Sequence, residues 1–70
     1  MKIFVERLKE AREEVGINIM ELAKRAETSH ANISRWASGT RMPNIEGLEK
    51  LCRALNVSAD FLLGLKDSMD

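Results

Sequence analysis

Apolar residues recur along this chain with the spacing of amphipathic helices. One apolar stripe runs through the first fifteen residues and another through residues 48–55. The stripe residues are Phe4, Leu8, Ala11 and Val15 in the first segment and Leu48, Leu51, Cys52 and Leu55 in the second. Steps of three and four residues place such side chains on one face of an α-helix. Because no segment alternates polar and apolar residues with the period of a strand, the pattern predicts an all-α protein.

Residues that favour helix ends divide the chain into five helices. A side-chain oxygen can cap the first turn of a helix at Asn18, Ser29 and Ser58, and Pro43-Asn44 opens a further helix. Gly16, Gly39 and Gly64 are typical stop residues, as is Asn56. The predicted helices are about residues 2–15, 19–26, 30–38, 45–55 and 59–64. They form one domain, residues 1–64, with a helix-turn-helix unit at 18–39 and a short tail at 65–70 that we expect to fray.

The turn between the second and third helices lacks its expected stop residue. A left-handed backbone conformation is expected at Glu27-Thr28, and glycine adopts this conformation most easily. A glutamate there would cost up to about 1 kcal/mol relative to glycine. The sequence therefore predicts either a strained turn or a turn of different geometry.

Size and composition exclude several classes of protein. Seventy residues, 44% of them hydrophobic and 31% charged, describe one small globular domain. No apolar run reaches membrane-spanning length, the N-terminus lacks a signal-peptide core, and the single Cys52 cannot form an intramolecular disulfide. We therefore expect a cytoplasmic protein that does not bind a membrane.

The sequence contains no recognisable catalytic or metal-binding pattern. No nucleophile–base pair with a positioned third group, no glycine loop for phosphate and no metal-ligand cluster is present. The only histidine, His30, has no second ligand and no obvious carboxylate partner. We expect no enzyme activity, no metal or cofactor, and no small-molecule substrate.

The net charge is zero, but the positive charge is concentrated in one segment. Residues 24–42 carry four basic side chains and one acidic side chain, whereas acidic residues outnumber basic ones both before and after this segment. Because nonspecific attraction to a polyanion follows the local field, any attraction to phosphate is expected at residues 24–42.

The third helix divides into a core face and a polar face. Ile33 and Trp36 lie three residues apart and turn inward. The outward side chains are His30, Ala31, Ser34 and Arg35, with Asn32 at the flank. Arginine can form two hydrogen bonds to guanine, and asparagine can form two to adenine. Alanine can pack on a thymine methyl, and serine and histidine can donate to base acceptors. This face predicts base readout in the major groove; the plainer alternative for His30, Arg35 and Arg41 is a solvated surface side chain.

Phosphate contacts are expected on both sides of this reading helix. They would come from the start of the second helix at Asn18 and from the loop Ser38-Gly39-Thr40-Arg41. The segment therefore has both elements that groove recognition needs, a reading face and flanking anchors.

The chain resembles the Xre-type helix-turn-helix family, the phage repressor and Cro-like DNA-binding domains. The matching residues are Gly16-Ile17, Glu21-Leu22-Ala23, Ser29, Ile33-Ser34-Arg35-Trp36, Ser38-Gly39, Arg41, Pro43, Leu48, Leu51, Ala54-Leu55, Val57-Ser58 and Asp60-Phe61-Leu62-Leu63-Gly64. The resemblance spans nearly the whole chain without gaps. It implies a five-helix lambda-repressor-like fold and a sequence-specific transcriptional regulator, most simply a repressor.

The resemblance also assigns roles to residues. It implies base contacts at His30, Ala31 and Arg35, with Asn32 and Ser34 as additions. It implies phosphate contacts at Asn18, Ile19, Ser38 and Arg41. A homodimer would place one reading helix in each half-site of a palindromic operator. Family analogy and leftover apolar residues point to a dimer interface at Leu62, Leu63 and Leu65.

Three positions depart from the family pattern. Ile19 replaces a glutamine that anchors a phosphate, and Glu27 replaces the turn glycine and adds a negative charge near the DNA side. Ala37 replaces a glutamate that pairs with an arginine of the first helix, which leaves Arg12 either to contact phosphate or to pair with another acid such as Glu13.

The neutral net charge, Ile19 and Glu27 motivate an alternative function beside the first one. The same fold can serve as a protein-interaction module, such as an antitoxin-like partner or a partner of another regulator. Ile19, Met20 and Met42 would then lie in a protein interface.

Overall fold

A computed structural model describes residues 1–70 as five α-helices with no strand. The helices are α1 (Lys2–Val15), α2 (Ile19–Arg25), α3 (His30–Ser38), α4 (Ile45–Leu55) and α5 (Ala59–Leu62). The predicted all-α fold is confirmed, and α2 and α5 end one and two residues earlier than the sequence indicates. No helix has the length and apolar character needed to cross a bilayer.

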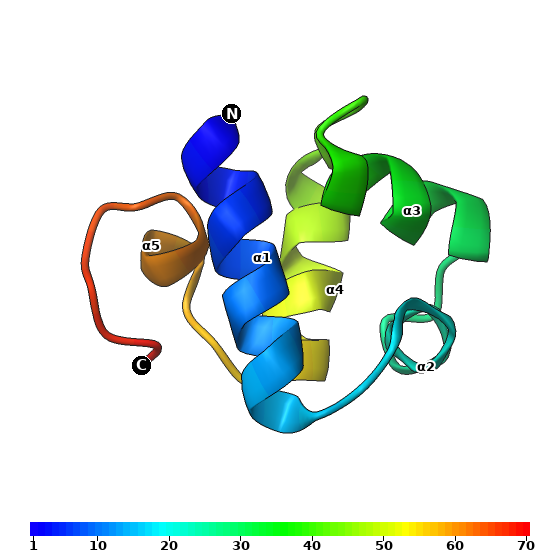
Figure 1. Ribbon diagram of the computed structural model, residues 1–70, viewed down its shortest axis with the longest axis horizontal. Coiled ribbons are helices and arrows are strands. Elements are labelled where there is room, and N and C mark those ends of the chain that lie inside the picture. Colours follow the sequence, from blue (N-terminus) through cyan, green and yellow to red (C-terminus); the bar gives the residue numbers. More distant parts are fainter.

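The core lies where α1 and α4 run side by side through the middle of the molecule (Figure 1). In this view α5 packs on one side of α1, and α2 and α3 lie on the other side. The buried hydrophobic residues are Phe4, Leu8, Ala11, Leu22, Ala23, Ala26, Ile33, Trp36, Leu51, Leu55, Val57, Phe61 and Leu62. All five helices contribute to this set, so the helix-turn-helix unit is fixed to the scaffold through shared packing.

Side-chain caps begin four of the helices. Asn18 Oδ1 accepts from Glu21 N at 2.8 Å, Ser29 Oγ accepts from Asn32 N at 3.0 Å, and Asn44 and Ser58 do the same for α4 and α5. Each cap satisfies a main-chain N–H that the helix leaves free and contributes about 1 kcal/mol. The caps predicted at Asn18, Ser29 and Ser58 are therefore confirmed.

The turn between α2 and α3 is left-handed at a glutamate. Glu27 has φ 54°, and the only other non-glycine residue with positive φ is Asn56, at the end of α4. Thr28 N donates to Ala23 O at 3.0 Å and Glu27 N donates to Lys24 O at 3.2 Å, which closes the end of α2. Of the two alternatives, the structure has the strained turn, because a side chain in this conformation crowds the following carbonyl.

Gly47 allows α4 to approach α3. A Cβ atom at this position would lie 2.8 Å from Cη2 of Trp36, closer than side-chain carbons approach one another. The indole ring of Trp36 therefore packs against the first turn of α4. This close contact sets the spacing between α3 and α4.

The C-terminal tail is docked, and the expectation that it frays is wrong. Met69 O accepts from Ser58 N at 2.8 Å. The guanidinium of Arg7 stacks over Phe61 at 4.4 Å, donates to Lys66 O at 3.2 Å and pairs with Asp67 at 3.1 Å. Hydrogen bonds and stacking from α1 and α5 thus hold a segment whose sequence alone shows only polarity.

Candidate nucleic-acid interface

The outer face of α3 is exposed over a buried inner face. Ile33 is fully buried and Trp36 is 6% exposed, so these two side chains anchor the helix. Ala31, Ser34 and Arg35 point away from them and are exposed. Arg35 forms no salt bridge, so its five N–H donors are free for an external partner.

The two remaining predicted base contacts lie at the edges of this face. His30 is the first residue of α3 and is exposed. Asn32 is half-buried, and its Nδ2 donates to Thr28 Oγ1 at 2.9 Å. The structure therefore brings four of the predicted base contacts, His30, Ala31, Ser34 and Arg35, to one surface. Asn32 instead lines a pocket between α3 and α4.

Hydrogen bonds shape the loop after α3. The Arg35 carbonyl accepts from Thr40 N at 3.0 Å and from Arg41 N at 3.3 Å. Ser38 Oγ donates to the same carbonyl at 3.1 Å and lies 2.8 Å from Thr40 Oγ1. Ser38, Thr40 and Arg41 are all exposed, so the loop presents two hydroxyls and one cation next to the end of the reading helix.

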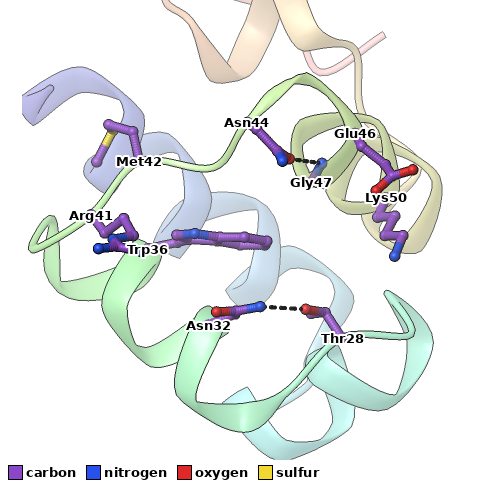
Figure 2. A pocket seen from close by; sticks show the side chains of 9 residues that line it. All are labelled: Thr28, Asn32, Trp36, Arg41, Met42, Asn44, Glu46, Gly47 and Lys50. Carbon is purple, nitrogen blue, oxygen red and sulfur yellow. Dashed lines mark hydrogen bonds between the residues drawn. The ribbon is translucent and has the colours of Figure 1, made fainter.

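A polar pocket of about 290 Å³ lies between α3 and α4 (Figure 2). Its lining residues are Thr28, Asn32, Trp36, Arg41, Met42, Asn44, Glu46, Gly47 and Lys50. Arg41 and Lys50 bring two cations to this pocket and Glu46 brings one carboxylate. Neither Asn44 nor Lys50 has a sequence signal that points to a site, because only the packing of α4 against α3 brings these side chains beside α3.

The side chains around the start of α2 are mostly apolar or already hydrogen-bonded within the protein. Asn18 uses its side-chain oxygen as the cap, and Ile19 packs partly against the core. Met20 is 67% exposed. Arg12 forms no ion pair with an acid; its Nη1 donates instead to Ile17 O at 3.0 Å.

The three leucines predicted at a dimer interface differ in exposure. Leu62 is 0% exposed and belongs to the core, Leu63 is half-buried, and Leu65 is 72% exposed. Leu62 therefore has no surface to offer a second copy.

A more continuous apolar surface lies elsewhere. An apolar groove of about 320 Å³ is lined by α4 and the start of α5, and its residues are Ile45, Leu48, Glu49, Cys52, Val57, Ser58 and Ala59. Burial raises the pKa of the Cys52 thiol, and the Glu49 carboxylate raises it further. The thiol is therefore neutral near pH 7 and adds apolar character to the groove.

The side chains that commonly bind metals do not form a cluster in this structure. No group of three His, Cys, Asp or Glu side chains is placed to hold a metal ion. The side chains that do gather on the α3 surface are hydrogen-bond donors and cations, which suit polar recognition of an extended anion.

Comparisons with known proteins agree with this geometry. The sequence pattern of the helix-turn-helix family matches residues 8–62. The HTH-type transcriptional regulator ImmR of Bacillus subtilis is 40% identical over 58 residues, which are 83% of this chain and 46% of ImmR. The chain thus spans about half the length of that relative.

Solved structures give the same result. The N-terminal DNA-binding domain of SinR from Bacillus subtilis superimposes with a TM-score of 0.85 at 30% identity, over 97% of this chain and 100% of that one. The P22 c2 repressor in complex with a synthetic operator gives a TM-score of 0.78 at 34% identity, over 84% of this chain and 89% of that one. The expected five-helix repressor-like fold is therefore confirmed.

Proposed function

Because this chain belongs to the helix-turn-helix family, we propose that it is a transcriptional regulator that binds double-stranded DNA with α3 in the major groove. The observation that carries the proposal is the exposed face of α3, where Arg35 has no internal partner above a buried Ile33 and Trp36. A similar fold is found in a repressor bound to operator DNA. Occupation of a promoter would make the protein a repressor.

Base readout is assigned to the outer face of α3. Arg35 forms a two-pronged contact with guanine, Ala31 packs on a thymine methyl, and His30 and Ser34 donate to base acceptors. Asn32 can reach an adenine only by exchanging its hydrogen bond to Thr28 Oγ1. Ala31, Ser34 and Arg35 are therefore the central readers and Asn32 is a secondary one.

Backbone anchoring is assigned to residues on either side of α3. Ser38, Thr40 and Arg41 bind phosphate from the loop, and Asn18 and Ile19 bind it from the start of α2, Ile19 through its main-chain N–H. Arg41 and Lys50 add positive charge beside the α3–α4 pocket. These contacts fix the register of α3 on the duplex.

The functional species is proposed to be a homodimer on a palindromic operator, with half-sites about one helical turn apart. The apolar groove between α4 and α5 supports this assembly, because Ile45 at its edge is 87% exposed. A continuous apolar groove gains more from pairing than two separate leucines do. The interface is therefore assigned to Ile45, Leu48 and Ala59, with Leu63 and Leu65 as the alternative.

Two substitutions separate reading from anchoring. The unmodified chain is used to select a DNA sequence from random duplexes, and binding is then measured on the best sequence and on single-base variants. Arg35→Ala should weaken binding by about 1–3 kcal/mol and relax one base position, whereas Arg41→Ala should weaken all sequences alike and lower the salt slope by about 1. Failure to select any consensus would reject the function, and identical behaviour of the two variants would reject the division of roles.

Met20 favours a second candidate function, a protein-interaction module that is antitoxin-like or a partner of another regulator. Its 67% exposed side chain lies beside the partly buried Ile19 at the start of α2, where it would contact a partner protein. Met42, which the sequence groups with these two residues, is half-buried and accepts from the Met1 amino group at the other end of α1, so it does not extend that contact. Purification with a stoichiometric protein partner, together with no measurable DNA affinity, would favour this function. Tight operator binding by the isolated chain would count against it.

A further inference from the structure

Arg12 joins the scaffold helix to the loop that precedes α2. Its main-chain carbonyl accepts from Gly16 N at 2.9 Å and from Ile17 N at 3.2 Å. Its side-chain Nη1 donates to Ile17 O at 3.0 Å. A single residue therefore satisfies both the N–H and the C=O of Ile17.

The side chain of Arg12 lies where three helices meet. It is half-buried and lines a small cavity of about 90 Å³ together with Leu8 of α1, Leu22 of α2, and Ile33 and Ala37 of α3. The aliphatic stem can pack on these apolar walls while the guanidinium reaches the loop. No carboxylate competes for the guanidinium, because none of the salt bridges includes Arg12.

Ile17, whose carbonyl Arg12 holds, lies directly before the helix-turn-helix unit. Ile17 is followed by Asn18, whose side chain caps α2, and α2 in turn packs against α3. A shift of the Ile17 carbonyl would therefore move the first turn of α2 relative to α1. The other hydrogen bonds of this loop, among them those from Gly16 N and Ile17 N to Arg12 O and from Glu21 N to Asn18 Oδ1, do not include the Ile17 carbonyl.

We propose that Arg12 is a positioning residue, whose guanidinium holds the Ile17 carbonyl and thereby sets the placement of α2 and α3 on DNA. The inference rests on the proposed DNA-binding function. It assigns to Arg12 a role through the protein backbone in place of the two alternatives from the sequence, a direct phosphate contact and an ion pair with an acid such as Glu13.

Replacement of Arg12 by citrulline tests this role by total synthesis of the full chain. Citrulline keeps the shape and a terminal N–H donor but has no charge, whereas Arg12→Met keeps the stem and loses both donor and charge. Lys9→Met is the matched control, because Lys9 lines the same cavity and is exposed. Dissociation constants are measured over a salt series on the selected DNA sequence.

We expect the citrulline chain to bind within about twofold of the unmodified chain with the same salt slope. We expect Arg12→Met to bind about tenfold more weakly on matched and mismatched sequences alike, and Lys9→Met to change binding less than twofold. A citrulline chain that is as weak as Arg12→Met, with a salt slope lower by about 0.9, would show a direct phosphate contact and overturn the proposal. Full affinity in Arg12→Met, or an equal loss in Lys9→Met, would also overturn it.

A measurement on the protein without DNA tests the Arg12–Ile17 contact independently of the proposed function. The carbonyl ¹³C resonance of Ile17 should move in Arg12→Met and stay in place in the citrulline chain, because only the methionine removes its hydrogen-bond donor. An unchanged resonance in Arg12→Met would overturn the clamp itself. Absence of DNA selection by the unmodified chain would instead reject the function.

Discussion

Replacement of Glu27 by glycine should stabilise the protein. Glu27 has φ 54°, a conformation that costs a non-glycine residue about 1–2 kcal/mol. Glycine removes this strain. It also lowers the free energy of unfolding by about 0.4–1 kcal/mol, because the unfolded chain has more conformational freedom with glycine at this position. The net expected gain in the free energy of unfolding is about 0.5–1 kcal/mol, which corresponds to a rise of about 2–8 °C in Tm for a domain of this size.

Urea and thermal unfolding of three variants tests the reasoning. Glu27→Gln removes the charge but keeps the strained backbone, so its stability should stay close to that of the unmodified protein. Glu10→Gly places glycine at an exposed position inside α1, where it should destabilise by about 0.5–1 kcal/mol. The strain argument is refuted if Glu27→Gly loses stability as Glu10→Gly does, or if Glu27→Gln gains as much as Glu27→Gly.

The remaining predictions concern packing and ionisation. Gly47→Ala should destabilise by about 1–3 kcal/mol and shift the fluorescence of Trp36, because the new Cβ meets the indole at 2.8 Å; unchanged fluorescence and stability would contradict this contact. Leu62→Ala should cost about 2–5 kcal/mol in urea unfolding and Leu65→Ala less than about 0.5 kcal/mol, since only the first is buried; equal losses would contradict the burial. The raised pKa of Cys52 means that the unfolded thiol ionises first, so stability is full below its ordinary pKa of 9.0 and falls as the pH rises through the folded value. Iodoacetamide at pH 8.5 should therefore alkylate the folded chain more slowly than the urea-unfolded chain.

Local signals in the sequence predict most of the fold. Helix periodicity gives the five helices, and Asn18, Ser29 and Ser58 give the starts of three of them, because a cap depends only on residues within one turn. The left-handed turn at Glu27 is one of two alternatives that the sequence leaves open, because this turn favours positive φ and a glutamate side chain opposes it. The reading face of α3 follows from the same periodicity.

Contacts between distant segments are what the sequence leaves out. The tail looks free in the sequence, yet Arg7 of α1 binds it across about sixty positions of the chain. Leu62 and Leu65 look alike as apolar residues near the end, but only the packing of α5 on α1 decides that one is buried and the other exposed.

An all-α helix-turn-helix domain and the outward residues of α3 follow from the sequence alone, because helix formation, capping and amphipathic spacing act over a few neighbouring residues. Only the folded arrangement of the helices gives the approach of α4 to Trp36 at Gly47, the α3–α4 pocket and the docked tail. Each of these depends on the packing of whole helices against one another. Side-chain spacing along one helix does not contain that information.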